Sequence, residues 1–229
     1  MSIFLAFSLT IVSTVLNITP LNRLTWKRCI SSRVACYGLP NSKTLGNLEA
    51  YVDCSVANCV PLLIQQNINR FNRSYFFNRS WAEFKVGFND SDGNYWLGND
   101  LLSQLTVSGQ YQLRFDLQSR SNTSNWYYAE YSTFRVLDET YGYKLEVAGY
   151  SGNAGFDALR PHDGMMFTTY DRDNDLYIYN CAAYWGGGFW YRNCARCGVN
   201  FAHSRGGFIW HGLPGGLQLQ SSRMWLQCK

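Results

Sequence analysis

The residues with the clearest chemical potential form a short acidic run, in which Asp171, Asp173 and Asp175 alternate with other residues. Carboxylates at this spacing are how short loops present hard oxygen ligands to Ca²⁺. The run is not an EF-hand, because Leu176 stands where that loop needs Gly and Ala182 where it needs Glu. The residues alone favour a non-EF calcium loop and a solvated acidic turn equally.

Eight cysteines form a second group of reactive residues, and none lies between Cys59 and Cys181. An even number of cysteines in a secreted chain indicates disulfides, although sequence cannot choose the pairing. Closing the loop from Cys181 to Cys194 would stabilise the fold by roughly 3 kcal/mol. Cys197 and His203 lie too close together for a zinc finger, and an oxidising compartment opposes free thiolates.

Catalysis finds little support. The chain has only three histidines, no G-x-S-x-G elbow and no H-E-x-x-H motif. Its net charge of +4 is spread over 229 residues without a basic block, so there is no electrostatic case for nucleic acid or an anionic membrane. We therefore expect a protein that is not an enzyme.

The N-terminus and the sequons indicate the compartment. The apolar, uncharged run from Met1 to Leu16 has the length of a signal peptide, with a buried strand or a signal anchor as the alternative. We expect residues 1–17 to be a cleaved signal, after which no run is long enough to span a membrane. The chain has five N-x-Ser/Thr sequons. One is Asn17, at the end of the expected signal, and the others are Asn72, Asn78, Asn89 and Asn122. We expect a secreted, extracellular glycoprotein.

The elements that must position these residues are mostly strands. Hydrophobic residues make up 46% of the chain and charged residues only 16%, so one large domain can fill a core. Alternating apolar and polar residues predict antiparallel strands at Tyr111–Leu117, Tyr127–Val136 and Tyr143–Val147.

One helix start is clear, and the C-terminal part is irregular. Ser80 and Glu83 have the spacing of a capping box, which predicts a short helix that ends at Gly87. From about Met165 onward the periodicity fades, and glycines, aromatics and cysteines predict loops held by crosslinks.

Five motifs, in the same order along the chain, resemble the fibrinogen C-terminal (fibrinogen-related) domain. They are Asn78-Arg-Ser-Trp-Ala-Glu-Phe-Lys-Val-Gly-Phe88, Tyr95-Trp-Leu-Gly-Asn-Asp100, Tyr111-Gln-Leu-Arg-Phe-Asp-Leu117, Gly149-Tyr-Ser-Gly-Asn-Ala-Gly155, and Thr169-Tyr-Asp-Arg-Asp-Asn-Asp175 followed by Asn180-Cys-Ala182. The resemblance covers about residues 64–210. It implies an α+β domain at 29–229, after a short segment at 18–28, with a central twisted antiparallel sheet, short helices and an irregular C-terminal lobe stabilised by a disulfide and calcium.

The resemblance also implies a metal site. The Ca²⁺ ligands would be the carboxylates of Asp173 and Asp175 and the main-chain carbonyls of Tyr177 and Tyr179. Asp171 would then support the loop without binding the ion.

Two disulfides follow from the same resemblance. One would join Cys181 to Cys194, with a cis peptide before Cys194. The other would join Cys29 to Cys54, with Cys36 as the alternative partner of Cys54. The cysteines left for further bridges, or for contacts with another chain, are Cys36, Cys59, Cys197 and Cys228.

The ligand pocket departs from the pattern of the lectin-like members. Where they carry Tyr, His and Tyr around a bound acetyl group, this chain has Trp185, Ala195 and Ser204. The candidate ligand-binding residues are Trp185, Tyr191, Asn193, Cys194, Ala195 and Ser204.

Two functions from different classes remain. The first is a calcium-dependent, lectin-like binder of glycans or acetylated groups in innate immunity. The second is a protein-binding signalling or matrix module of the angiopoietin or tenascin type, with an extracellular protein receptor as its partner. In either case avidity would have to come from self-association, so we expect a homo-oligomer.

Overall fold

The structure is a computed structural model that describes residues 27–31, 34–38, 61–68, 75–107, 109–202 and 208–229. The signal expected at 1–17, the sequon at Asn72, the candidate ligand residue Ser204 and the expected bridge to Cys54 lie outside the described residues. No helix in the described part is long and apolar enough to cross a membrane.

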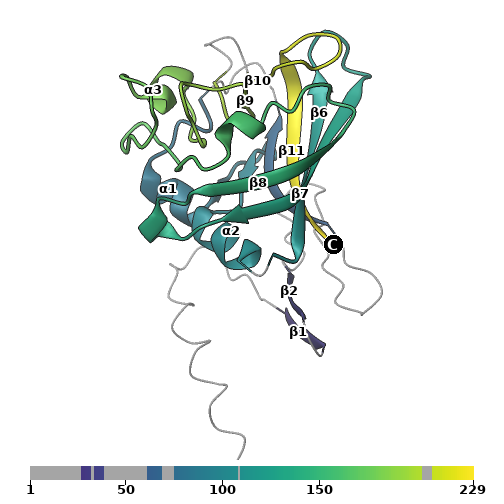
Figure 1. Cartoon of the computed structure of the whole chain (residues 1–229), viewed down its shortest axis with the longest axis vertical. Coiled ribbons are helices and arrows are strands. Elements are labelled where there is room, and N and C mark those ends of the chain that lie inside the picture. Colours follow the sequence, from purple (N-terminus) through teal and green to yellow (C-terminus); the bar gives the residue numbers. More distant parts are fainter. Residues whose placement is uncertain (1–26, 32–33, 39–60, 69–74, 108, 203–207) are drawn as a thin grey trace, which may run out of the picture.

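A seven-stranded antiparallel sheet forms the body of the molecule (Figure 1). Its strands are β3 (Leu62–Ile68), β4 (Phe88–Asn89), β5 (Tyr95–Trp96), β6 (Tyr111–Ser119), β7 (Trp126–Val136), β8 (Leu145–Gly152) and β11 (Leu219–Cys228). They pair in the order β4-β5-β3-β11-β6-β7-β8. Two short antiparallel pairs lie outside this sheet: β1 (Lys27–Ser31) with β2 (Val34–Gly38), and β9 (Cys197–Gly198) with β10 (Ile209–Trp210).

The three predicted strands are confirmed as β6, β7 and β8. On β6, Leu113, Phe115 and Leu117 are fully buried, whereas Arg114 and Asp116 between them are half-buried on the opposite face. This alternation is what a sheet with one face on the core requires, because successive side chains point to opposite faces.

The expectation of loops throughout the C-terminal part is wrong for residues 219–228. They form β11, which lies in the middle of the sheet between β3 and β6. The pairing register of this strand shifts next to Leu219 and again between Met224 and Trp225. Each irregularity breaks the period of two, which is why the alternation is hard to see in the sequence.

The helical elements are all short. They are α1 (Trp81–Val86), α2 (Asn99–Thr106), α3 (Cys181–Trp185) and the 3₁₀ turns η1 (Glu139–Tyr141) and η2 (Arg160–His162). The capping box is confirmed, since the Ser80 hydroxyl accepts from the Glu83 amide at 3.3 Å and the Glu83 carboxylate accepts from the Ser80 amide at 2.9 Å. Gly87 ends α1 at φ 91°, and a Cβ there would lie 2.6 Å from the Leu97 carbonyl oxygen.

Aromatic rings join the irregular lobe to the sheet and its helices. Phe84 from α1 and Trp96 from β5 both contact Phe167, at ring-centroid distances of 5.0 and 5.9 Å. Trp190 packs against Phe167 at 5.2 Å and donates its indole N–H to the Tyr143 carbonyl oxygen at 2.7 Å. Because these rings are almost completely buried, the lobe shares one core with the sheet.

Candidate calcium loop and ligand-binding lobe

The acidic loop is fastened to α1 through Asp171. One carboxylate oxygen of Asp171 accepts hydrogen bonds from the Trp81 amide at 2.9 Å and from the Thr169 hydroxyl at 2.7 Å. The Trp81 amide is one of the unpaired donors at the start of α1, so the acceptor satisfies it and complements the helix dipole. Asp171 therefore has a structural task, because it fastens the acidic loop to the start of α1.

Asp173 and Asp175 lie beside each other at the turn of the loop. The Asp175 amide donates to the Asp173 carboxylate at 3.2 Å. The two oxygens of Asp175 accept from the Tyr177 amide at 2.8 Å and from the Cys181 amide at 2.9 Å. Partial burial, together with the charge of Asp173, raises the pKa of Asp175. A cation bound between two neighbouring carboxylates would relieve that repulsion.

The other two expected ligands are main-chain carbonyls with no competing partner. Within the described residues, neither the Tyr177 nor the Tyr179 carbonyl oxygen accepts a hydrogen bond. No cluster of three or more His, Cys, Asp or Glu side chains suited to a metal occurs there either, so a cation on this loop would need main-chain oxygens. Two carboxylates and two carbonyls are hard donors of the kind that Ca²⁺ takes, and water would complete its six to eight ligands. The donor set fits calcium.

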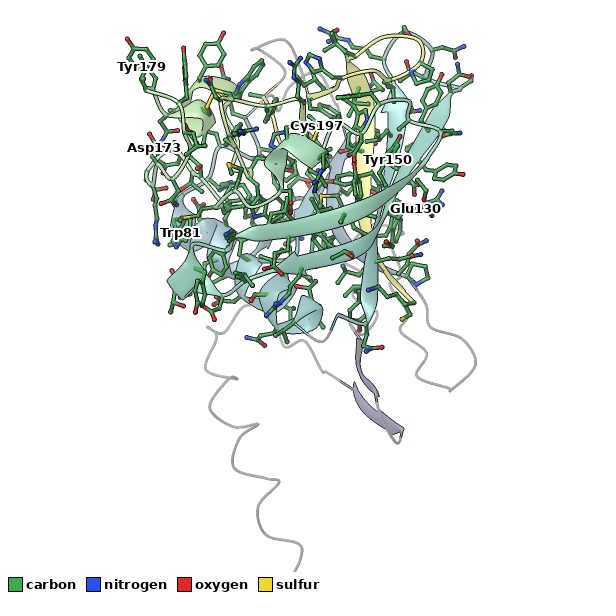
Figure 2. The ribbon with its side chains drawn as sticks, viewed as in Figure 1. Trp81, Glu130, Tyr150, Asp173, Tyr179 and Cys197 are labelled. Carbon is green, nitrogen blue, oxygen red and sulfur yellow. A yellow bond between two sulfur atoms is a disulfide. The ribbon has the colours of Figure 1, made fainter. Side chains whose placement is uncertain are left out.

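Asn180 connects the acidic loop to α3. Its amide group donates to the Thr169 carbonyl oxygen at 2.9 Å, while its side-chain oxygen accepts from the Ala183 amide at 2.7 Å and caps α3. The next residue, Cys181, forms the expected disulfide with Cys194. The loop, the helix and the 181–194 crosslink are therefore one connected unit, shown in the upper left of Figure 2.

A stack of three aromatic rings forms the wall of the candidate ligand pocket. The Trp185 ring lies parallel to Phe201 at 4.8 Å, and Phe201 lies parallel to Tyr191 at 5.5 Å. Only Trp185 is partly exposed, whereas Phe201 and Tyr191 are buried. The indole nitrogen of Trp185 is buried without a hydrogen-bond partner. The accessible part of the Trp185 ring is an aromatic surface against which a sugar or a planar group can pack.

The remaining sequence-predicted residues separate into accessible and buried positions. Asn193 is exposed, and Cys194 and Ala195 are half-buried on the segment that passes the pocket. Tyr191 lies inside, where its hydroxyl donates to the Gly187 carbonyl oxygen at 2.5 Å. The expected cis peptide before Cys194 is wrong, because no described peptide bond is cis.

His162 stands in no sequence motif, yet it organises this segment. The imidazole is completely buried, its Nδ1 lies 2.7 Å from the Trp190 carbonyl oxygen, and its Nε2 accepts from the Arg196 amide at 3.1 Å. The ring therefore joins the two ends of the stretch that carries Asn193 to Ala195. Burial, reinforced by the charge of Arg192, lowers the pKa of His162 to about 4. The sequence around it has no metal or catalytic spacing, so no sequence signal could have identified it.

Two of the additional cysteines are now assigned. Cys228, the last residue of β11, is disulfide-bonded. Cys197 is a free thiol with no exposed surface, and burial raises its pKa. A fully buried thiol cannot bridge to another chain, so the alternative of an intermolecular bond is excluded for Cys197 in the folded state.

The three sequons within the described residues are at the surface. Asn78, Asn89 and Asn122 are all exposed, as a glycosylated asparagine must be. Asn122 lies in the turn between β6 and β7, where its side chain accepts from the Ser124 amide at 3.0 Å.

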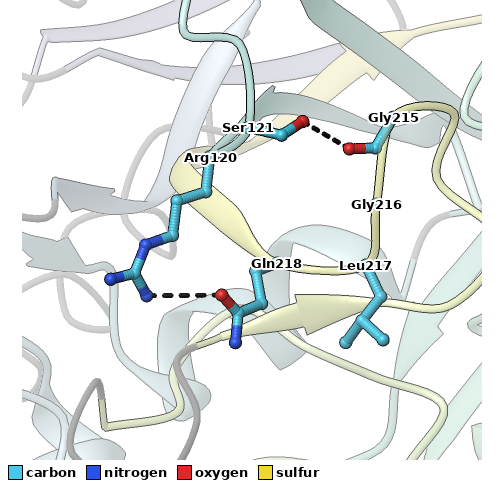
Figure 3. Close-up of a pocket in the computed structure, with 6 residues that line it drawn as sticks. All are labelled: Arg120, Ser121, Gly215, Gly216, Leu217 and Gln218. Atoms are coloured by element: carbon cyan, nitrogen blue, oxygen red, sulfur yellow. Dashed lines mark hydrogen bonds between the residues drawn. The ribbon is translucent and has the colours of Figure 1, made fainter.

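A separate shallow pocket lies beside this turn, just before the start of β11. It encloses about 250 Å³ and is lined by Arg120, Ser121, Gly215, Gly216, Leu217 and Gln218 (Figure 3). Arg120 donates to the Gln218 side chain at 3.4 Å and Ser121 to the Gly215 carbonyl oxygen. Figure 1 places the glycine loop at the opposite upper corner from α3, so this pocket is not part of the calcium loop.

Comparison with known sequences identifies relatives of several kinds. Tenascin of Mus musculus is 42% identical over 152 residues, which are 61% of this chain and 7% of tenascin. Microfibril-associated glycoprotein 4 of the same species is 43% identical over 136 residues, 57% of this chain and 52% of the relative. Techylectin-5A of Tachypleus tridentatus is 35% identical over 163 residues, 71% of this chain and 55% of that protein. The chain thus spans about half the length of the last two relatives and a small part of the first.

Solved structures also superpose on this chain. The fibrinogen-like globe domain of human ANGPTL2 superposes with a TM-score of 0.69 at 29% identity, and the match covers 95% of this chain and 97% of that one. Lamprey fibrin D-dimer in complex with the peptide Gly-His-Arg-Pro-amide superposes with a TM-score of 0.62 at 28% identity, over 72% of this chain and 60% of that one.

The family model for the C-terminal globular domain of fibrinogen beta and gamma chains matches residues 30–224, almost the whole chain. The expected α+β fold, with its antiparallel sheet, short helices and the disulfide between Cys181 and Cys194, is the one found. The chain belongs to the fibrinogen C-terminal domain family.

Proposed function

We propose that the chain is a secreted recognition domain that binds glycans or acetylated groups in a calcium-dependent manner. The observation that carries the proposal is the connection between the acidic loop and the candidate pocket. Asp175 accepts from the Cys181 amide, and Cys181 begins the helix that presents Trp185. The similarity to Techylectin-5A, a protein named as a lectin, supports the same function.

In this proposal the ion holds the loop and does not have to touch the ligand. Asp173, Asp175 and the carbonyls of Tyr177 and Tyr179 would bind Ca²⁺, whose double charge offsets the two carboxylates. Trp185 would supply the stacking surface for the ligand, and Tyr191 would support the aromatic wall from inside. Asn193, Cys194 and Ala195 would make further contacts, as would Ser204, which lies outside the described residues.

The ligand is tested with the purified, secreted chain on a glycan array and on acetylated resin, at millimolar Ca²⁺ and with EDTA. Binding that EDTA removes supports the proposal. The absence of any glycan or acetyl-resin signal at millimolar Ca²⁺ refutes it.

The metal site is tested separately by thermal unfolding. Calcium should raise the melting temperature of the wild-type chain, because an ion that binds only the folded state stabilises it. Replacing both Asp173 and Asp175 by Asn should abolish the rise. Glu146→Gln serves as the control, since Glu146 lies on β8 in an exposed ion pair with Arg135 at 3.4 Å and should keep the rise. An unchanged rise in the double variant would exclude this loop as the site.

A second function is favoured by a different observation. The acetyl-binding residues of lectin-like members are replaced by Trp185 and Ala195, and the tenascin and microfibril-associated glycoprotein relatives show higher identity than the lectin. The chain would then be a protein-binding signalling or matrix module. Binding to an extracellular protein receptor with no glycan signal on the array would establish this alternative.

A further inference from the structure

The outer side of the lobe carries an exposed apolar surface that the proposed ligand pocket does not use. Leu176, Tyr177, Ile178 and Tyr179 follow one another in the chain and are 63%, 42%, 80% and 67% exposed. We define the lobe surface by these four residues together with Tyr170 and Tyr184, which are 46% and 56% exposed. Figure 2 shows Tyr179 at the outer margin of the lobe, pointing away from the sheet.

The backbone holds these side chains outward. The Leu176 amide donates to the Arg192 carbonyl oxygen at 2.8 Å, and Asn180 reaches the Tyr170 carbonyl oxygen at 3.3 Å. The Tyr184 amide in turn donates to the Asn180 carbonyl oxygen at 3.1 Å. These hydrogen bonds hold the main chain of the lobe surface in place. A run of four exposed apolar residues favours association and is retained in soluble proteins mainly where something covers it.

The chemistry of the surface favours a protein as its occupant. Four of its six residues are tyrosines, which are enriched in protein interfaces because a large ring is combined with a hydroxyl. An anionic bilayer is disfavoured by the carboxylates of Asp171, Asp173 and Asp175 in the same stretch, while the one cation among them, Arg172, lies over the Trp81 ring at 3.9 Å.

The area matches that of a dimer contact. At about 200 Å² for a fully exposed large side chain, the exposed fractions of the six residues amount to roughly 700 Å², close to the ~800 Å² that each partner contributes to a standard interface. In a two-fold contact the same patch serves both partners. Next to the surface, Arg192 is exposed and forms no ion pair with another described residue, so its guanidinium is available to a carboxylate of the second copy.

We propose that the lobe surface is the contact through which two copies of this chain form a symmetric dimer. The contact would bury Ile178 and Tyr179 of both copies near its centre, with Tyr184, which packs against Trp185 at 5.2 Å, at the margin next to the candidate ligand pocket. Such a dimer would give a single recognition domain two ligand sites and hence avidity.

The test is the oligomeric state of the full secreted chain, measured by sedimentation velocity and light scattering from about 1 to 100 µM. The wild-type chain should show a concentration-dependent equilibrium between monomer and dimer. Ile178→Glu should weaken the dimer by about tenfold or more, because it places two like charges at the centre of the contact. The matched control is Val107→Glu, since Val107 is 61% exposed at the end of α2, and this variant should dimerise as the wild type does.

Circular dichroism and the melting temperature confirm that each variant is folded. The proposal is overturned if the wild-type chain is monomeric over the whole range, or if Ile178→Glu dimerises as tightly as the control. A monomeric wild type that co-sediments with phosphatidylserine vesicles, and loses this on Ile178→Glu, would assign the surface to membranes instead. The calcium-induced rise in melting temperature is measured independently of the dimer, so failure of the metal site and failure of the dimer remain distinguishable.

Discussion

Acidification should destabilise this domain through His162. The buried imidazole is neutral in the folded state, with a pKa of about 4, whereas in the unfolded chain it returns to about 6.5. A depressed histidine pKa contributes stability that is fully present above the unfolded value and is lost as pH falls toward the folded one. The free energy of unfolding should therefore fall by about 3 kcal/mol between pH 7 and pH 4 on account of this one group.

The geometry explains why protonation is opposed. A protonated ring would turn the Nε2 acceptor of His162 into a donor facing the Arg196 amide, which is itself a donor 3.1 Å away. Phe189 packs against the ring at 5.4 Å, and the nearest charge from the pocket segment is the cation of Arg192. Beside His162 in the chain, the charges of Arg160 and Asp163 offset each other in an ion pair at 3.2 Å. No carboxylate in this set accepts the imidazolium proton.

The assay is urea unfolding followed by tryptophan fluorescence at intervals from pH 8 to pH 4, with disulfides intact. We compare the wild type with His162→Gln, which is less stable at pH 7 but lacks the titrating group. Between pH 6 and pH 5 the wild-type curve should lose about 1.2 kcal/mol more than the variant. Contributions of other groups, such as the raised pKa of Asp175, cancel in this difference.

Parallel curves for the wild type and His162→Gln would refute the reasoning. If His162→Gln folds poorly, the protonation of His162 is measured directly in the wild type by its ring-proton resonance. The ring-proton resonance of His162 in the native wild type should show no titration between pH 7 and pH 5, whereas an ordinary exposed histidine titrates near 6.5.

Two substitutions and one thiol-labelling experiment test the packing that supports the site. Ser80→Ala removes the capping hydroxyl that accepts from the Glu83 amide, and should lower the free energy of unfolding by about 1 kcal/mol in urea titrations. Gly187→Ala should cost about 1–3 kcal/mol in the same titrations, because the new Cβ would lie 1.9 Å from the Asn200 carbonyl oxygen. Cys197 should react with a thiol reagent only after denaturant is added, since the thiol is buried and its pKa is raised; labelling of the native protein at the rate of an exposed thiol would contradict this.

Local patterns along the chain were sufficient to predict the regular part of the fold. The alternation over residues 111–117 and the capping box at Ser80 depend on neighbours within a few residues, and the structure confirms both. The strand at 219–228 was missed because its register shifts break the period and because its place between β3 and β6 depends on partners more than 100 residues away. Sequence alone carries no record of such pairings.

The same distinction applies to the candidate site. The spacing of Asp171, Asp173 and Asp175 was enough to predict a cation loop. The structure adds that Asp171 accepts a hydrogen bond from the Trp81 amide. His162 could not be foreseen, because its role depends on the main chain of Trp190 and Arg196, which any residue could supply. Hydrogen bonds to main-chain atoms do not restrict the residue type of the partner, so they cannot be recognised in the sequence.

The path between loop and pocket bears on how calcium dependence should be interpreted. Asp175 accepts from the amide of Cys181, the first residue of α3, and Trp185 is the last residue of that helix. Without an ion, burial and the charge of Asp173 both disfavour the charged carboxylate of Asp175, so the acceptor that holds the Cys181 amide at the start of α3 is less well stabilised. Loss of ligand binding in EDTA would then follow from a displaced Trp185, even if no ligand atom ever approached the ion. A bound ion and a stacking ring can thus be coupled through one carboxylate and one short helix.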